Sequence, residues 1–565
     1  MSKKPRIAHL AGPTATIQNT PPLVTSNKAR ARHGLPLMKD GVGSPLAFDA
    51  LRAQRLAAPA KLYVEQFSAH PMERDASELY GPPDGYMGPD GELLAEPTSD
   101  ADKPVYEIIL EPEDGLYPLP YMAVQADGRP WEEECANPGA PEEQARQGFF
   151  PDGSRSFEEI DRLSIGEDGR ASLISQVADV DFHRGLPPAG FKKGLAHELR
   201  GDVGEGDIPP ETRGEDFYAY KPYHLATVPT RPMLAKATND MQVLAASGDY
   251  DGMIWTQGSP QVEETAYWFN LLIDTSLPIC GNAAQRPQGQ ISNDGPKNIV
   301  DSVNFIASGI WADDGGRNKC GTVVIQEQQI FAAREVAKVD ARPGGYTATG
   351  GHGGIIGQFS HTGRMALTYL PVFKHTYLSE MNMSRLPDSQ MAARQGAGGI
   401  ETVEVAVKDM DGKLLAEAIP AVSIVKDGSY SGLEVGDDPT LELDLIALIE
   451  QKLGMGRLTG IVAEGLVPYG SLPTKARHQL LIKAALSGIP VAKVGRGAPE
   501  GFADPHEFQI AAANLTGSKA RILLMAALLK LGSLPPARDP DNPSSTELDA
   551  IRKGVAAYQE IFDSH

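Results

Sequence analysis

The stretch Asp251-Gly-Met-Ile-Trp-Thr-Gln-Gly-Ser-Pro-Gln-Val-Glu-Glu-Thr-Ala-Tyr267 decides which fold we expect for the chain. Its first five residues predict a buried strand, and residues 263–273 predict a helix. A strand followed closely by a helix is the repeating unit of a parallel sheet. Since ligands of such sheets bind beyond the carboxyl ends of the strands, polar chemistry is expected in the turn between the two elements.

The same alternation continues on both sides of this stretch. In the N-terminal part we expect strands at residues 7–11, 61–67, 277–280 and 321–325, and helices at residues 47–56, 234–246 and 298–306. Near the C-terminus we expect strands at residues 421–425, 460–462 and 490–494, and a helix at residues 519–531. The predicted fold class is therefore α/β, with a larger N-terminal domain built on a doubly wound parallel sheet and a smaller C-terminal α/β domain.

Residues 75–225 differ in composition from both domains. Gly, Pro, Asp and Glu dominate there, and short apolar runs alternate with turn residues, which predicts a β-rich insertion or an extended arm. A disordered linker is the alternative that this composition leaves open. The predicted organisation is a discontinuous N-terminal domain (1–73 and 230–402), the insertion (74–229), a linking hairpin (403–420) with its turn at Asp411-Gly412, and a C-terminal domain (421–565).

The composition argues against several classes of function. The formal charge of −22, from 52 Lys and Arg against 74 Asp and Glu, would repel nucleic-acid phosphates and anionic membranes. The three cysteines show no CxxC spacing and the histidines no HExxH spacing, so we expect neither a disulfide framework nor a metal site. There is no run of about 18 apolar residues and no secretory leader pattern at the start. We therefore expect a cytoplasmic protein that binds neither nucleic acid nor membrane.

Four motifs occur in the order found in one enzyme family. Residues 251–267 resemble the strand ending in His-Gly-Thr-Asp-Thr and the helix opening with Glu-Glu-Thr-Ala of the bacterial asparaginases and glutaminases. Further motifs of that family resemble Pro278-Ile-Cys-Gly-Asn-Ala-Ala-Gln-Arg-Pro287, Ser292-Asn-Asp-Gly-Pro-Lys-Asn298 and Leu515-Thr-Gly-Ser-Lys-Ala-Arg521. The resemblance covers residues 1–73 and 230–565, and it implies an asparaginase-like two-domain fold and the hydrolysis of an amide.

The resemblance implies a threonine nucleophile in the first turn, where the family has Gly-Gly-Thr-Ile. This chain has Gly12-Pro-Thr-Ala-Thr-Ile17, so either Thr14 or Thr16 fits the role. We favour Thr16 because it directly precedes the isoleucine. A threonine hydroxyl needs a neighbouring base and an oxyanion site, both of which a strand-end turn can supply. A threonine that only caps a helix is the alternative.

A second loop of the family, Gly-Ser-x-Asp-Met, is similar to Phe67-Ser-Ala-His-Pro-Met72. The resemblance makes Ser68 a candidate substrate contact. His70 stands where the family has an acid, and it is either a further contact or a loop histidine with no role.

In the third loop, the resemblance aligns Ser259 with a threonine, Pro260 with an aspartate, and Lys338 with the lysine that completes a second hydroxyl-activating unit. Gly258, beside them, is expected to contact the substrate. Without a carboxylate at Pro260, one force that keeps Lys338 protonated is missing, so Ser259 and Lys338 are expected to act together as a base. A surface lysine is the alternative reading of Lys338.

The replacement of the family's aspartate by Pro260 also changes which substrate we expect. In the family, the aspartate helps to bind the α-ammonium group of asparagine, and a buried site without that charge would reject an ammonium group. We therefore expect hydrolysis of a lactam, a cyclic imide or another amide of a non-amino acid, through a threonine nucleophile and without a cofactor. The alternatives are a true asparaginase or glutaminase, and a non-catalytic metabolite-binding protein. The resemblance also implies a homo-oligomer, either a dimer or a tetramer.

Overall fold

The computed structural model describes residues 4–12, 23–26, 48–51, 53–55, 60–64, 81–88, 93–110, 116–118, 150–151, 174, 176–184, 190–192, 217–218, 229–259, 261–286, 292, 294–342, 344–349, 352–428, 438–466, 469–496, 503 and 505–565. The chain divides into two compact units. The main unit comprises Met1–Ile17, Leu173–Gly194 and Pro222–His565, and the second unit comprises Gln18–Ser172 and Leu195–Lys221. No helix among the described residues is long and apolar enough to span a membrane.

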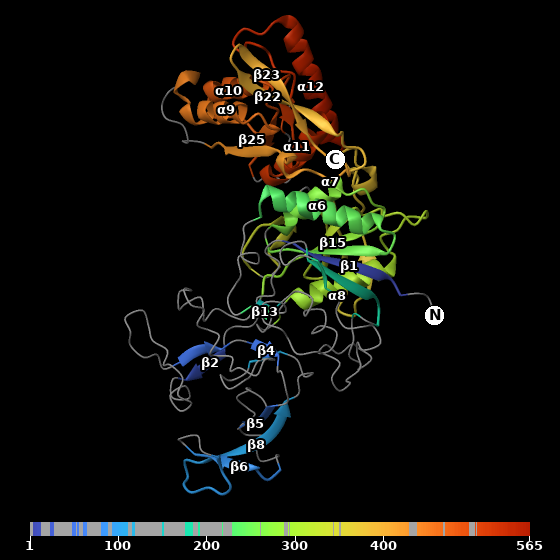
Figure 1. The fold of residues 1–565 in the computed structure, drawn as a ribbon, viewed down its shortest axis with the longest axis vertical. Coiled ribbons are helices and arrows are strands. Elements are labelled where there is room, and N and C mark those ends of the chain that lie inside the picture. Colours follow the sequence, from blue (N-terminus) through green and yellow to red (C-terminus); the bar gives the residue numbers. More distant parts are fainter. Residues whose placement is uncertain are drawn as a thin grey trace. The chain divides into compact units, whose positions relative to one another are not determined.

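A nine-stranded sheet forms the centre of the N-terminal part of the main unit (Figure 1). Its strands lie in the order β12 (Gly190–Lys192), β11 (Asp179–Arg184), β1 (Arg6–Ala11), β14 (Gly252–Thr256), β15 (Ile279–Asn282), β16 (Thr322–Gln326), β17 (Gln329–Ala332), β20 (Ile355–Phe359) and β21 (Met365–Leu367). The five strands from β11 to β16 run parallel, and the strands at both edges pair antiparallel. The four strands predicted at residues 7–11, 251–255, 277–280 and 321–325 are confirmed to within two residues.

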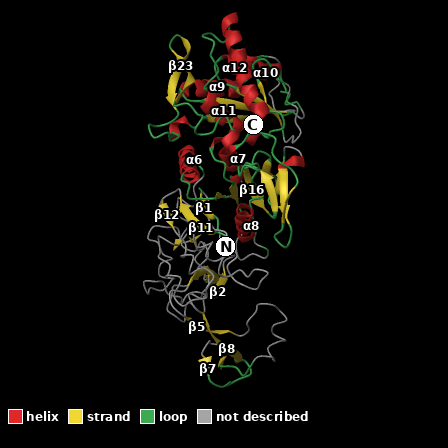
Figure 2. Cartoon of the chain, turned by 90° about the vertical axis from the view of Figure 1, so that its right-hand side faces the viewer, coloured by secondary structure: helices red, strands yellow, loops and turns green. Residues whose placement is uncertain are grey.

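Helices cover both faces of this sheet, as a doubly wound fold requires. Helices α6 (Arg231–Ala246) and α7 (Val262–Leu272) lie on one side, and α8 (Gly295–Ser308) lies on the other (Figures 1 and 2). Because the sheet and the C-terminal helices enclose α7, its apolar side chains are buried, Trp268 and Phe269 completely. The predicted α/β class and the doubly wound arrangement are confirmed.

The C-terminal part of the main unit has a second, smaller parallel sheet. Its strands are β24 (Ala421–Lys426), β25 (Thr459–Gly465), β26 (Val491–Gly495) and β27 (Ile510–Ala511), and its helices are α9 (Leu443–Met455), α10 (Lys475–Leu486), α11 (Gly517–Leu531) and α12 (Ser545–Ser564). Helix α11 packs against α7 as well as against β24 and β25, and it is buried along most of its length. One continuous apolar core therefore runs from the large sheet into the small one.

The linking hairpin differs from the prediction. The long hairpin consists of β22 (Ser389–Gly396) and β23 (Gly399–Ala406), so it begins earlier than residue 403. Its reversal depends on Gly399, whose φ of +122° other residues rarely adopt. The Asp411-Gly412 turn closes a shorter reversal, in which Lys408 bridges Leu414.

Two predicted elements near the insertion, and one strand within it that was not predicted, also differ from the expected organisation. Strand β11, within residues 74–229, belongs to the large sheet and pairs with β1, because Val180 and Phe182 are buried and the Asp181 carboxylate accepts a 3.0 Å hydrogen bond from Arg6 Nε. Residues 61–67 were expected in that sheet, but β5 (Ala60–Val64) pairs antiparallel with β8 (Lys103–Leu110) in the second unit. The predicted helix 47–56 is instead two strands, β3 (Phe48–Leu51) and β4 (Ala53–Arg55), because pairing with distant strands outweighs the helical pattern.

The described residues of the second unit form strands and turns and contain no helix. Strands β5 and β8 join β6 (Gly85–Met87) and β7 (Leu93–Leu94) in one four-stranded sheet. The remaining strands of this unit form pairs: β2 (Leu23–Ser26) with β3, β4 with β9 (Leu116–Pro118), and β10 (Phe150–Pro151) with β13 (Phe217–Tyr218). The β-rich insertion over residues 74–229 stays a prediction, because most of that segment lies outside the described residues.

Candidate active site

The turn after β14 lies beside the end of β1. The Gly12 N–H donates to the Thr256 carbonyl oxygen at 2.9 Å, and His9 Nε2 lies 2.7 Å from Thr256 Oγ1. Burial lowers the pKa of His9 to about 3, so this imidazole is neutral. A Cβ atom on Gly12 would lie 2.2 Å from the ring of Trp255, so only glycine fits there. Gly12, which precedes residues 13–17 in the chain, therefore lies next to Trp255 and Thr256.

Five of the predicted site residues lie outside the described residues: Thr14, Thr16, Ser68, His70 and Pro260. Their roles stay predictions. The other three, Gly258, Ser259 and Lys338, are described and belong to the main unit.

Ser259 and Lys338 both contact the side chain of Tyr346. The Tyr346 hydroxyl donates a 2.8 Å hydrogen bond to Ser259 Oγ, and Lys338 Nζ lies 4.9 Å from the centroid of the Tyr346 ring. No direct hydrogen bond joins Ser259 to Lys338 among the contacts of the described residues. The tyrosine therefore connects the two side chains that the sequence analysis placed in one unit.

The position of Lys338 follows from a short antiparallel pair, β18 (Val336–Lys338) and β19 (Tyr346–Ala348), in which Lys338 is directly opposite Tyr346. The Lys338 Nζ atom is shielded from solvent and has no hydrogen-bond partner within the described part of the chain. Burial lowers the pKa of Lys338, and the negative charges of Asp340 and Asp294 act in the opposite direction. An unpaired amine with a lowered pKa is suited to accept a proton.

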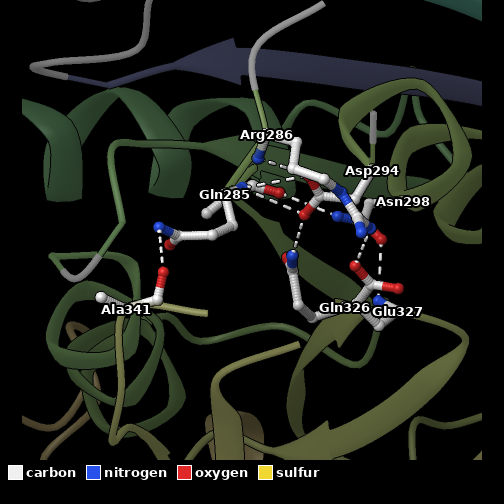
Figure 3. Close-up of polar contacts among 8 residues, drawn as sticks. Gln285, Arg286, Asp294, Asn298, Gln326, Glu327 and Ala341 are labelled. Carbon is white, nitrogen blue, oxygen red and sulfur yellow. Dashed lines mark hydrogen bonds and ion pairs between the residues drawn. The ribbon is translucent and has the colours of Figure 1, made fainter. Parts of the chain in front are cut away.

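A polar cluster supports the loop next to this lysine, and Figure 3 shows its members: Gln285, Arg286, Asp294, Asn298, Gln326, Glu327 and Ala341. The Asp294 carboxylate, which is buried, accepts hydrogen bonds from the backbone N–H groups of Gln285 (3.0 Å) and Arg286 (2.8 Å). Gln285 Nε2 donates to the Ala341 carbonyl oxygen at 2.9 Å. Since Ala341 lies between β18 and β19, the cluster anchors the loop that joins Lys338 to Tyr346.

The first turn of α7 is held from the C-terminal part of the main unit. The fully buried Lys519 of α11 donates from Nζ to the carbonyl oxygens of Glu263 (2.6 Å) and Ala333 (2.7 Å). Burial lowers the pKa of Lys519 to about 8. The Glu263 carboxylate accepts the backbone N–H of Lys338. Helix α11 thus holds Glu263 in place, and Glu263 in turn binds the backbone of Lys338.

A cavity of about 300 Å³ opens on the other side of the same turn, among α6, α7, α11 and β24. Gln257, Gln261 and Glu264 line it, whereas Ser259, Lys338 and Tyr346 do not. We therefore place the candidate chemistry at Ser259 and not in this cavity. Among the described residues, no three His, Cys, Asp or Glu side chains are grouped as a metal site would need.

Neither Tyr346 nor Asp294 was among the predicted site residues. Asp294 stands in the motif Ser292-Asn-Asp294, which was singled out only as a resemblance. For Tyr346, the signal was the Gly344-Gly345 turn between two short β-prone segments. A hairpin across that turn would have placed Tyr346 near Lys338.

One family model matches the part of the chain that contains these residues. The model "Asparaginase, N-terminal" matches residues 230–346, which include Ser259, Asp294, Lys338 and Tyr346.

The chain is also similar to curated proteins that are named as asparaginases or glutaminases. A glutaminase-asparaginase of Acinetobacter glutaminasificans is 30% identical over 154 residues, which is 27% of this chain and 43% of the relative. An L-asparaginase 2 of Bacillus subtilis is 33% identical over 108 residues, 19% of this chain and 27% of the relative. The chain thus spans less than half the length of these relatives. A solved structure of a probable cytoplasmic L-asparaginase from Campylobacter jejuni gives a TM-score of 0.45 at 21% identity, and it covers 69% of this chain and 93% of its own.

Proposed function

We propose that this chain, which is asparaginase-like in its sequence, hydrolyses the C–N bond of a small-molecule amide. The observation that carries the proposal is the cluster of Ser259, which follows the carboxyl end of β14, with Tyr346 and Lys338, whose Nζ has no hydrogen-bond partner among the described residues. That end of a parallel strand is where α/β folds bind their ligands.

In the proposed reaction, a threonine hydroxyl, from Thr16 or Thr14, attacks the amide carbonyl and forms an acyl-enzyme. Its proton passes through Ser259 to Lys338, and the leaving amine takes a proton back as the C–N bond breaks. Water then cleaves the ester, which releases a carboxylic acid and restores the threonine hydroxyl. The hydrogen bond from Gly12 to the Thr256 carbonyl oxygen supports this arrangement, because it holds the residue that precedes the two threonines beside the strand that leads to Ser259.

For the substrate we propose an amide without an α-ammonium group, such as a lactam, a cyclic imide or another neutral amide. Pro260 supports this choice, because it offers neither a carboxylate nor an N–H where the family has its ammonium-binding aspartate. A second candidate is L-asparagine or L-glutamine, which the names of the relatives favour.

The discriminating experiment is product release from a panel of L-asparagine, L-glutamine, simple amides, lactams and cyclic imides. Turnover of a neutral amide with little turnover of L-asparagine supports the first substrate class. Rapid turnover of L-asparagine would instead support the second candidate, L-asparagine or L-glutamine. Ligand-induced thermal stabilisation without any product would instead indicate a metabolite-binding protein.

We also propose that the chain works as a homo-oligomer in the cytoplasm, as the resemblance to asparaginases implies. Sedimentation analysis of the full chain tests the first part: a dimer or tetramer at micromolar concentration is expected, and a strictly monomeric species that turns over substrate would contradict it.

A further inference from the structure

We propose that Tyr346 is a positioning residue, whose hydroxyl orients Ser259 and whose ring holds Lys338 beside it. The inference rests on the proposed function and adds to it a residue that contacts both Ser259 and Lys338. Tyr346 lies within hydrogen-bond distance of one partner and in ring contact with the other.

The hydroxyl of Tyr346 fixes the direction in which Ser259 can donate. A phenol has one proton, and Tyr346 donates it to Ser259 Oγ at 2.8 Å. The hydrogen of Ser259 must then point to another acceptor, and the described residues offer none to it. Burial raises the pKa of Tyr346, so the phenol stays a donor throughout the working pH range. The Ser259 proton is therefore directed away from the Tyr346 hydroxyl and is available for transfer to Lys338 when Ser259 takes the proton of the nucleophile.

The ring of Tyr346 holds Lys338 without neutralising it. Lys338 and Tyr346 are a directly opposed pair on β18 and β19, so their side chains share one face. A cation over an aromatic ring at 4.9 Å is attracted to the ring face, and Lys338 Nζ donates no hydrogen bond to any residue that the structure describes. A carboxylate in that place would keep the amine protonated. The ring thus leaves Lys338 free to exchange a proton with Ser259 or the substrate.

The experiment is a double-mutant cycle with Tyr346→Phe and Ser259→Ala, assayed with whichever amide of the panel the wild type hydrolyses. We expect Tyr346→Phe to lower kcat by roughly 10–100-fold with less than about a threefold change in KM. The double mutant should be no slower than Ser259→Ala alone, because the hydroxyl acts only through that serine. Multiplicative losses, or an unchanged kcat in Tyr346→Phe, would overturn the positioning role.

The matched control is Tyr558→Phe. Tyr558 is also a buried tyrosine that donates to an oxygen, the Gly532 carbonyl, but it lies in the C-terminal part far along the chain from the site. This variant should keep wild-type kcat even if it unfolds at a lower temperature. An equal loss of kcat in both variants would mean that Tyr346 acts only by stabilising the fold.

A second measurement does not need turnover. In protein labelled with [ε-¹³C]lysine, the Lys338 signal, identified by its loss in Lys338→Arg, is titrated by NMR. The midpoint should be unchanged in Tyr346→Phe, which keeps the ring, and should rise in Tyr346→Leu, which admits water. Equal midpoints in all three proteins would overturn the role of the ring. If the whole panel gives no product, the proposed function fails, while this titration still decides the contact between Lys338 and Tyr346.

Discussion

Gly12 and Trp255 pack so closely that a Cβ atom on Gly12 would lie 2.2 Å from the indole ring. This contact brings the end of β1 against the end of β14 and sets where the segment with Thr14 and Thr16 begins.

The first prediction is that Gly12→Ala destabilises the main unit. Since Trp255 is 1% exposed and its Nε1 donates to Gln257, the ring has little room to move. Overpacking of this kind typically costs about 1–3 kcal/mol in the free energy of unfolding. Chemical denaturation measures the change. The control is Gly454→Ala in α9, where nothing lies within 4 Å of the new Cβ atom and helix propensity should add up to about 1 kcal/mol. Equal stability of both variants would contradict the packing.

The second prediction concerns pH. If Lys338 is the base, kcat/KM should rise with pH as Lys338 loses its proton, and because its pKa is lowered by burial, the rise should lie below 10.5, the usual value for lysine. Asp340→Asn removes a charge that raises this pKa, so the rise should move to lower pH. Asp313→Asn is the control, because Asp313 also accepts from an arginine in a turn but does not act on Lys338. An identical profile in both variants would exclude Lys338 as the group that titrates.

The third prediction concerns Lys519, which connects the C-terminal part of the main unit to its N-terminal part. Lys519→Met should remove the hydrogen bonds that the Glu263 and Ala333 carbonyl oxygens accept from Lys519, at about 1–3 kcal/mol each. The folded pKa of Lys519, about 8, is below its unfolded value, so burying the charged form costs stability at neutral pH. That cost disappears as pH rises from about 8 to 10.5. The stability advantage of the wild type over Lys519→Met should therefore grow across this range, and a constant difference would contradict it.

The fourth prediction tests whether β11 belongs to the large sheet. Asp181 is 3% exposed and accepts from Arg6 Nε at 3.0 Å and from the Tyr250 hydroxyl at 3.3 Å. Asp181→Ala should cost about 1–3 kcal/mol, because it removes the acceptor of the Tyr250 hydroxyl and of the partly exposed Arg6 side chain. Asp240→Ala, which breaks an exposed pair with Lys236 on α6, should cost under about 0.5 kcal/mol. Similar effects of both substitutions on the unfolding free energy would argue that β11 is not part of this sheet.

The regular alternation of strands and helices was predictable because local pattern alone specifies it. Residues 251–267 form a strand and a helix in the structure because an apolar run is followed by a turn and then by an amphipathic segment. Which strands pair with each other was not predictable from local pattern. The run at 61–67 has the pattern of a buried strand, but only long-range packing decides that it pairs with β8, and that β11 takes the place beside β1.

The resemblance to family motifs was enough to predict Ser259 and Lys338 as site residues. Tyr346 was missed because its role depends on the register of a short hairpin, which sets Lys338 opposite Tyr346. A register is fixed by pairing and turn geometry, which the order of residue types does not specify.

Whether this site hydrolyses an amide is tested most directly by comparing Lys338→Met with the wild type on the amide panel. Lys374→Met, which removes an exposed lysine paired with Glu380, is the control. If Lys338 is the base, its loss should lower kcat/KM by about 10²–10⁴-fold, while Lys374→Met keeps full activity. Turnover of the same amide by Lys338→Met at the wild-type rate would contradict the proposed chemistry.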